Sequence, residues 1–295
     1  MTSGNENGSQ RFQDIQDAVS ERYSGIAERV LAEAATVDRQ DTGELTLDFI
    51  QNVDPGQSCC VSDQSDPSSA NCGSSASELS DVGGECTSKG SMLYSEEQAA
   101  ELPDSALDAS LGCGNPVALA ELNSGETILD LGSGGGIDCF LAARQVGLDG
   151  EVWGLDMTPS MIRLARWNAE KIEAKNVRFR LGEIEDIPFQ SDHFDTVISN
   201  CVINLSTDKA RVFREVFRVM KPGGKLRVSD MVWTRNISQE ERGDAEAWAS
   251  CIAGALPLTE YLEIITRAGF VDATADYEDN DRGVTSAYVS AMKPR

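Results

Sequence analysis

Apolar residues recur along most of the chain with two spacings, one typical of strands and one typical of helices. From residue 93 onward, short apolar or alternating runs predict seven strands, at residues 126–131, 151–156, 177–181, 194–200, 225–232, 271–277 and 285–292. Between them the apolar spacing is helical, at residues 137–146, from 159 onward, around 212–220, 238–251 and 259–268. Strands that alternate with helices form right-handed βαβ units, so we expect an α/β fold with a doubly wound, mostly parallel sheet.

Residues typical of helix ends stand at the limits of several predicted helices. Thr158 precedes Pro159, and a threonine cap followed by proline in the first turn is a favourable helix start. Ser238 and Glu241 have the spacing of a capping box for the helix that reaches residue 251. The run Lys221-Pro222-Gly223-Gly224 indicates where the preceding helix ends.

The first third of the chain follows a different pattern. Residues 10–36 have apolar positions close to helical spacing, which predicts a helix. Residues 54–91 are rich in Ser, Gly, Asp and Cys, and they bury too little apolar surface to offset the entropy of ordering. We therefore expect an N-terminal helical segment at 1–53, a flexible cysteine-containing arm at 54–92 and the α/β domain at 93–295.

The charge of the chain excludes several classes of partner. Lys and Arg number 25 against 49 Asp and Glu, a formal net charge of −24. Binding to phosphate groups requires clustered cations, so this balance argues against nucleic acid and against anionic membrane surfaces. The acidic excess is spread along the whole chain, which favours a halophilic, salt-adapted surface over an ordinary acidic one. No apolar run has the ~20 residues of a membrane span, and the first residues do not resemble a signal peptide, so we expect a cytoplasmic protein.

A glycine-rich loop, Asp130-Leu131-Gly132-Ser133-Gly134-Gly135-Gly136, follows the first predicted strand of the α/β domain. Glycines allow a tight turn and close approach of a ligand to the backbone, and the following helix N-terminus offers free N–H groups. Asp156 ends the next strand, where a carboxylate can accept hydrogen bonds from two ribose hydroxyls. A dinucleotide fingerprint would require glycine at position 137, which is Ile137, so the spacing is G-x-G-x-G.

This combination resembles the class I S-adenosylmethionine-dependent methyltransferases, whose sheet is seven-stranded and Rossmann-like. By the same resemblance, residues 182–184 would face the adenine of S-adenosylmethionine, and Asn200 would lie beside its methionine part. The implied cofactor-binding residues are Asp130, Gly132, Ser133, Gly134, Gly136, Asp156, Met157, Gly182, Glu183, Ile184 and Asn200.

The chain contains eight cysteines, which is many for the reducing compartment expected here, where a framework of structural disulfides is not expected. No C-x-x-C pair occurs, so the spacing fits no zinc finger. Cys113, Cys201 and Cys251 can reach the carboxyl edge of the predicted sheet, where open parallel sheets bind their ligands. Thiolates select soft, thiophilic centres, so these three suggest a substrate that thiolates hold. Cys139 lies inside a predicted helix and is expected to be a small core residue.

The motifs around these cysteines are similar to those of the arsenite methyltransferase family throughout residues 93–270. They are LGCGNP, ETILDLGSGGGIDCFLAARQVG, GLDMTP, LGEIEDIPF, SNCVINLS, RVMKPGG and CIAGAL. The resemblance implies that Cys113, Cys201 and Cys251 bind trivalent arsenic, as arsenite or its thiol conjugates, and that S-adenosylmethionine methylates its lone pair. It also implies a relay thiol, Cys59 or Cys60, that forms a disulfide with a site cysteine and is restored by thioredoxin or a small-thiol reductant.

One departure from the family concerns Ser110 and Leu111, which stand where some members have an aromatic pair before the first site cysteine. A lone-pair nucleophile needs positioning rather than a general base, which agrees with a solvated surface role for the only histidine, His193. Two other functions stay open. One alternative is another small-molecule C- or O-methyltransferase whose cysteines only pack, and the other is a metalloid-binding protein that performs no chemistry.

Overall fold

The computed structural model describes residues 3–42, 93–100, 102–118, 120–235, 252 and 254–295. The chain divides into two units, one formed by Met1–Ala34 with Glu85–Arg295 and the other by Ala35–Gly84. Outside the described residues lie the predicted arm at 54–92, the capping box at Ser238 and Glu241, and the cysteines Cys59, Cys60, Cys72, Cys86 and Cys251. The three-part division of the chain stays a prediction.

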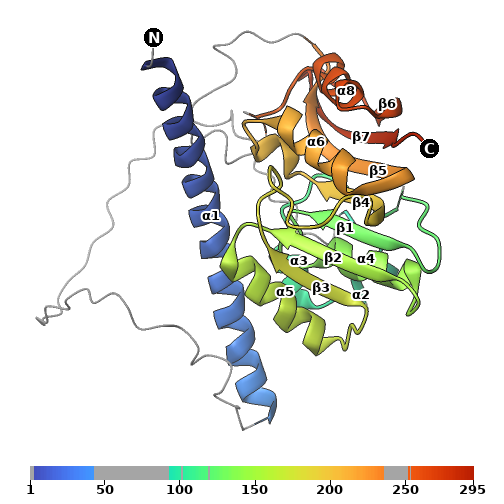
Figure 1. Ribbon diagram of the computed structural model, residues 1–295. Coiled ribbons are helices and arrows are strands. Elements are labelled where there is room, and N and C mark those ends of the chain that lie inside the picture. Colours follow the sequence, from blue (N-terminus) through green and yellow to red (C-terminus); the bar gives the residue numbers. More distant parts are fainter. Residues whose placement is uncertain (1–2, 43–92, 101, 119, 236–251, 253) are drawn as a thin grey trace, which may run out of the picture. The chain divides into compact units, whose positions relative to one another are not determined.

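The first unit is built on a seven-stranded sheet in the order β3-β2-β1-β4-β5-β7-β6 (Figure 1). The strands are β1 (Thr127–Leu131), β2 (Glu151–Asp156), β3 (Val177–Leu181), β4 (Phe194–Asn200), β5 (Met220–Trp233), β6 (Val271–Tyr277) and β7 (Val284–Met292). Strands β1 to β5 pair in parallel, and β7 runs antiparallel between β5 and β6. The predicted mostly parallel sheet is confirmed. Its strand order reverses between β1 and β4, and open α/β sheets bind ligands at such a point.

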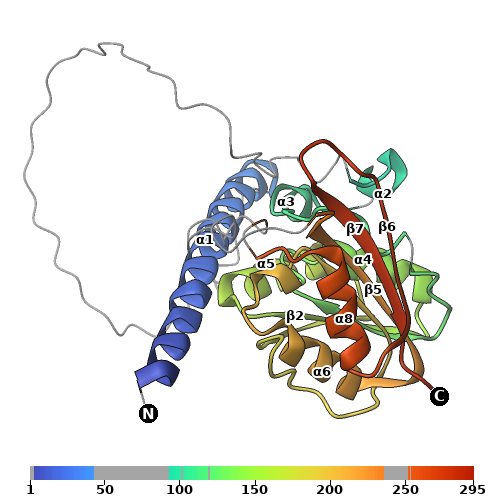
Figure 2. The ribbon, with the colours of Figure 1, turned by 90° about the horizontal axis from the view of Figure 1, so that it is seen from above.

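Helices cover both faces of this sheet, as predicted for a doubly wound fold. They are α2 (Glu96–Ala100), α3 (Asp104–Asp108), α4 (Ile137–Val146), α5 (Pro159–Lys171), the 3-10 turn η3 (Ile203–Leu205), α6 (Lys209–Val219) and α8 (Leu258–Arg267). Figure 2 shows α4 and α8 on opposite sides of the sheet. On one face Phe140 of α4 packs in the same cluster as Ile128, and on the other Phe213 and Tyr261 pack with Leu129. Strand β1 is therefore buried on both sides, which agrees with its mostly apolar sequence TILDL, in which Asp130 is the buried exception.

The start of β5 and the caps of two helices differ from the sequence-based expectation. Strand β5 begins at Met220 rather than at residue 225, because Met220 already pairs with Phe194 before the register shifts. Gly223 has φ +81° and accommodates the irregular backbone there. Thr158 precedes α5, but its side chain makes no capping hydrogen bond. The cap that the pattern missed is Asp208, whose carboxylate accepts the N–H of Arg211 at 2.9 Å and begins α6.

The N-terminal helix is α1 (Ser3–Thr42), which is longer than the predicted helix at 10–36. Its buried residues Ile15 and Val19 pack in one cluster with Cys201 and Leu205 at the end of β4 and in η3. Further along, Ala27 and Val30 share a cluster with side chains of α5. The first part of α1 therefore belongs to the α/β unit. None of the described helices is long and apolar enough to cross a membrane.

Candidate methyl-donor pocket and cysteine pair

A hollow of about 1010 Å³, a volume that includes open solvent at its mouth, lies at the carboxyl ends of β1, β2 and β4. The predicted site residues that line it are Gly132, Ser133, Gly134, Asp156, Met157, Gly182, Ile184, Asn200 and Cys201. Helix α1 contributes Gln16, Val19 and Tyr23 to the same wall, which the sequence pattern did not predict. The structure therefore brings most of the predicted cofactor set to the switch point of the sheet.

The glycine loop shapes the floor of this pocket. Gly132 has φ +68°, and a Cβ there would collide with the side chain of Val202, so only glycine fits. Gly134 has φ +50°, but a Cβ there would meet nothing within 4 Å, because the residue faces the open pocket. Gly136 lies against Phe140 and is not among the residues that line the pocket, so its predicted contact with the cofactor stays a prediction.

Asp156 is held by the backbone on two sides. One carboxylate oxygen accepts the N–H of Gly134 at 3.0 Å, and the other accepts the N–H of Thr158 at 2.8 Å. Burial raises the pKa of Asp156, and these two backbone hydrogen bonds oppose the rise. A carboxylate oxygen has more than one acceptor position. Asp156 can therefore receive hydroxyl groups of a ligand while the loop keeps it in place.

Asp130 does not reach the pocket, although it precedes the glycine loop. It is buried, and its carboxylate accepts a hydrogen bond from the thiol of Cys139 at 3.3 Å. Burial and the nearby charge of Asp138 raise the pKa of Asp130 well above its usual value. Cys139 is the small buried residue that the sequence predicted, with a hydrogen-bonding role added.

A polar network that sequence reasoning missed joins α4 to the end of β4. The carboxylate of Asp138 accepts hydrogen bonds from the Tyr94 hydroxyl and the Asn200 amide, each at 3.0 Å. The Asn200 amide also donates to the carbonyl of Gly114 at 2.7 Å, and its oxygen accepts the N–H of Cys113 at 3.1 Å. Burial raises the pKa of Asp138 to about 6, and both donors oppose this rise. In the sequence, Asp138 is indistinguishable from any acidic residue in a first helical turn.

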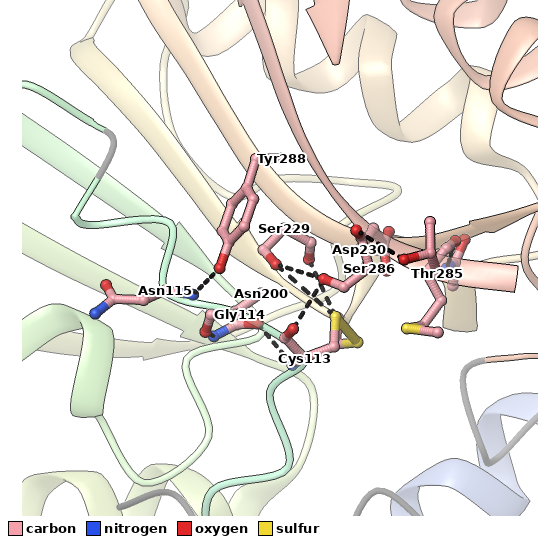
Figure 3. Close-up of a disulfide and its surroundings, with 12 residues drawn as sticks. Cys113, Gly114, Asn115, Asn200, Ser229, Asp230, Thr285, Ser286 and Tyr288 are labelled. Carbon is pink, nitrogen blue, oxygen red and sulfur yellow. Dashed lines mark hydrogen bonds between the residues drawn. A yellow bond between two sulfur atoms is a disulfide. The ribbon is translucent and has the colours of Figure 1, made fainter. Parts of the chain in front are cut away.

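Cys113 and Cys201 are 88 residues apart in the sequence and are joined by a disulfide (Figure 3). The free thiols expected at these positions therefore form a covalent pair in this structure, because the fold brings the two loops together. Cys201 lines the pocket and has φ +59° at the turn after β4. The Cys113 loop is fixed by Asn200 and by Ser286 of β7, whose hydroxyl donates to the Cys113 carbonyl at 2.8 Å.

Other predicted site residues fall elsewhere. Glu183 does not line the pocket, whereas its neighbour Glu185 does and accepts a hydrogen bond from the Ser206 hydroxyl at 2.5 Å. His193 is half-buried against Phe189 and Phe194 and is not part of the pocket wall. The roles of Cys251, Cys59 and Cys60 stay predictions, since these residues lie outside the described part of the chain.

The sheet order, the glycine loop and Asp156 at the end of β2 together are typical of a methyltransferase domain. The family model for such a methyltransferase domain matches residues 122–269. An arsenite methyltransferase of Halobacterium salinarum is 38% identical over 296 residues, covering 96% of this chain and 67% of the relative. One of Aquipseudomonas alcaligenes is 41% identical over 168 residues, 55% of this chain and 48% of the relative.

Among solved structures, an arsenic(III) S-adenosylmethionine methyltransferase from Chlamydomonas reinhardtii superimposes with a TM-score of 0.60. It is 32% identical in sequence, and the match covers 68% of this chain and 72% of that one. The chain therefore belongs to the arsenite methyltransferase family. It spans about two thirds of the Halobacterium relative and about half of the Aquipseudomonas relative.

The pocket fits S-adenosylmethionine, the cosubstrate of this class. The Ser133 hydroxyl is buried without a hydrogen-bond partner among the described residues, although Ser133 lines the pocket. Gly134 leaves open space at its Cα, and Asp156 lies where a ribose would be recognised. The donor set and the space agree with a nucleoside that carries a polar tail.

Proposed function

We propose that this chain transfers a methyl group from S-adenosylmethionine to trivalent arsenic held by Cys113, Cys201 and Cys251. Its substrate is arsenite or a thiol conjugate of arsenite, and methylarsenite is a second substrate of the same kind. When bound, S-adenosylmethionine supplies an electrophilic methyl group. The residues of the chain hold the nucleophile and the donor in one pocket, and such positioning can supply most of the acceleration.

The observation that carries this proposal is the meeting of two distant cysteines at the donor pocket. Cys113 and Cys201 have Cα atoms 5.8 Å apart, and Cys201 is itself part of the pocket wall. A methyltransferase for carbon or oxygen acceptors has no need of paired sulfurs at this place. Thiolates are ligands for soft centres, and the family relatives are named for arsenite.

A reductant belongs to the proposed cycle. Sulfurs joined in a disulfide cannot bind arsenic, so the Cys113–Cys201 pair must first be reduced to two thiolates. Thioredoxin or a small thiol supplies the two electrons by thiol–disulfide exchange, with Cys59 or Cys60 as the relay thiol. This requirement supports a cytoplasmic location, where such reductants are kept reduced.

The test is a turnover assay with arsenite, S-adenosylmethionine and thiol, read by mass spectrometry of the arsenic products. We expect Cys113→Ser, Cys201→Ser and Cys251→Ser each to abolish or severely reduce arsenite methylation. Cys139→Ser is the matched control, because a serine hydroxyl can still donate to Asp130 and the residue lies outside the pocket wall. A parental rate in any of the three site variants would refute the three-thiolate site.

The same assay separates the alternative functions. Methylation of a carbon or oxygen acceptor with no arsenic product would indicate another small-molecule methyltransferase. Stoichiometric arsenic binding without turnover would indicate a binding protein. Substitution of Cys59 and Cys60 together by Ser tests the relay, since it should slow turnover with thioredoxin and leave arsenite affinity nearly unchanged.

A further inference from the structure

The wall of the donor pocket contains acidic side chains and no basic ones. Among the described residues that line it, the charged side chains are those of Asp138, Asp156 and Glu185, and no Lys, Arg or His is present. Such a wall favours a ligand that carries positive charge. Asp156 is held by the glycine loop and Glu185 by the Ser206 hydroxyl, which leaves the role of Asp138 open.

Asp138 carries its charge without a counter-ion. The residue lies in the first turn of α4 and is only 7% exposed. One carboxylate oxygen accepts a hydrogen bond from the Tyr94 hydroxyl and the other accepts one from the Asn200 amide, each at 3.0 Å. Both donors are uncharged, and within the described part of the chain Asp138 takes part in no ion pair. A buried charge of this kind is costly, so a positively charged ligand group beside it would be stabilising.

The position of Asp138 at a helix start does not by itself account for this burial. The helix dipole favours an acid in the first turn, but unpaired acidic side chains are rarely buried. At Asp138 burial outweighs both hydrogen bonds and raises the pKa to about 6. The charge of Asp138 in turn helps to raise the pKa of Asp130, a second buried carboxylate. Both carboxylates would therefore be stabilised by a cation bound at this wall.

The place of Asp138 in the pocket matches the methionine part of S-adenosylmethionine. Asp156, at the end of β2, marks the ribose end of the pocket. The methyl group must lie near Cys201, which lines the same pocket and holds the acceptor in the proposed function. In S-adenosylmethionine the methionine chain begins at the sulfur that carries the methyl group. Asp138 is hydrogen-bonded to Asn200, the residue before Cys201, so it lies on the side of the pocket where this chain begins.

We propose that Asp138 binds the α-ammonium group of the methionine part of S-adenosylmethionine, and that Tyr94 and Asn200 position its carboxylate for this contact. The placement of the methionine part rests on the proposed function. Each carboxylate oxygen has a second lone pair, so Asp138 can accept from the ammonium group and keep both present donors. A hydrogen bond between two charged groups is stronger than one between neutral groups. Asp138 therefore selects ligands that carry the amino group.

The test compares ligands that share the nucleoside and differ in the tail. S-adenosylhomocysteine carries the whole amino acid, its deaminated analogue keeps the carboxylate but lacks the amino group, and methylthioadenosine has no amino acid tail. Their affinities are measured by calorimetry on the full chain without arsenic. We expect the parent to bind S-adenosylhomocysteine about tenfold or more tightly than the deaminated analogue, the effect of a hydrogen bond between charged groups.

Asp138→Asn should remove this preference. The asparagine oxygen can still accept from the Asn200 amide, and its nitrogen can donate to the Tyr94 oxygen, so the network keeps its shape. The variant should bind S-adenosylhomocysteine about tenfold more weakly and change the affinity for methylthioadenosine less than about twofold. Glu185→Gln is the matched control, because it removes another buried carboxylate from the same wall and should keep the preference for the amino group.

The possible contrary results are distinct. Equal affinities of the parent for S-adenosylhomocysteine and its deaminated analogue would overturn the proposal, and this measurement does not depend on the folding of a variant. An unchanged preference in Asp138→Asn would overturn it as well. So would an equal loss of preference in Glu185→Gln, which would indicate general attraction by the acidic wall, or equal weakening of all three ligands in Asp138→Asn, which would indicate a structural role alone. Because no arsenic is present, a failure of arsenite methylation would leave this binding result standing.

Discussion

Replacement of Asn200 by aspartate would turn a hydrogen-bond donor into an acceptor between the donor pocket and the Cys113–Cys201 pair. The Asn200 amide nitrogen donates to the Gly114 carbonyl at 2.7 Å and to the Asp138 carboxylate at 3.0 Å. In Asn200→Asp an oxygen takes the place of this nitrogen and faces two acceptors. The oxygen that accepts the N–H of Cys113 is retained, so the substitution removes the donors alone.

The magnitude follows from these two contacts. A neutral hydrogen bond contributes about 1 kcal/mol and one to a charged group about 1.5–3 kcal/mol, so the variant should lose about 2.5–4 kcal/mol at pH 8. That is a large part of the ~5–15 kcal/mol stability of a typical domain. At acidic pH the introduced carboxyl and Asp138 can share one proton, which restores a donor between them. The loss should then fall to about 1–2 kcal/mol.

The assay is urea unfolding at pH 8 and pH 5.5, together with arsenite binding by the reduced chain. Asn176→Asp is the matched control, because the Asn176 amide also donates to two carbonyls, of Ala143 and Gly147, and lies outside the pocket wall. It should lower stability without changing arsenite affinity. A stable Asn200→Asp variant at pH 8, or one whose loss does not shrink at pH 5.5, would refute the reasoning.

Three further outcomes follow from the structure. Gly132→Ala should lower the free energy of unfolding in urea by about 2–4 kcal/mol and weaken S-adenosylmethionine binding, because its φ is positive and the added Cβ would collide with Val202. The control Gly125→Ala, also at positive φ but in open space, should lower it by only about 1–2 kcal/mol. Because the pKa of Asp138 is raised to about 6 in the folded chain, its ionisation destabilises the fold as the pH rises from about 4 to 7. Relative to Asp138→Asn, the parent should lose about 3 kcal/mol of unfolding free energy over that range. Parallel pH profiles of the two proteins would contradict this. The net charge of −24 predicts that the melting temperature rises from dilute to molar KCl, since salt screens repulsion among carboxylates, and a flat or falling curve would remove the salt-adapted reading.

Most of the fold could be predicted from local patterns. Strand β1 is buried on both faces and is mostly apolar in sequence, and α4 and β2 have the bounds that the periodicity predicted. The glycine loop and Asp156 could be placed because strand ends in a parallel sheet share one edge. These are features in which a short stretch of sequence fixes its own structure and position.

The residues that sequence reasoning missed act through contacts between distant segments. Asp138 looks like a helix-start acid, yet its partners Tyr94 and Asn200 are 44 and 62 residues away. Asp230 lies near the carboxyl end of β5 in an ordinary strand sequence, and only the folded chain brings its carboxylate within 4.8 Å of the sulfurs of Cys113 and Cys201. Asp130 is the opposite case. Its position before the glycine loop suggested a ligand contact, whereas its side chain points to Cys139.

Asn200 links the two halves of the proposed chemistry through one side chain. Its backbone ends β4 and leads directly into Cys201, while its amide group holds both the Cys113 loop and Asp138, in the helix that follows the glycine loop. A Cβ at Gly112 would lie only 2.5 Å from the Asn200 amide nitrogen, so the cysteine loop has no room to shift past it. Because packed contacts of this kind cannot deform gradually, a displacement of the glycine loop must move Asn200 or break its hydrogen bonds. The Asn200 amide therefore fixes the position of the Cys113 loop relative to the helix that follows the glycine loop.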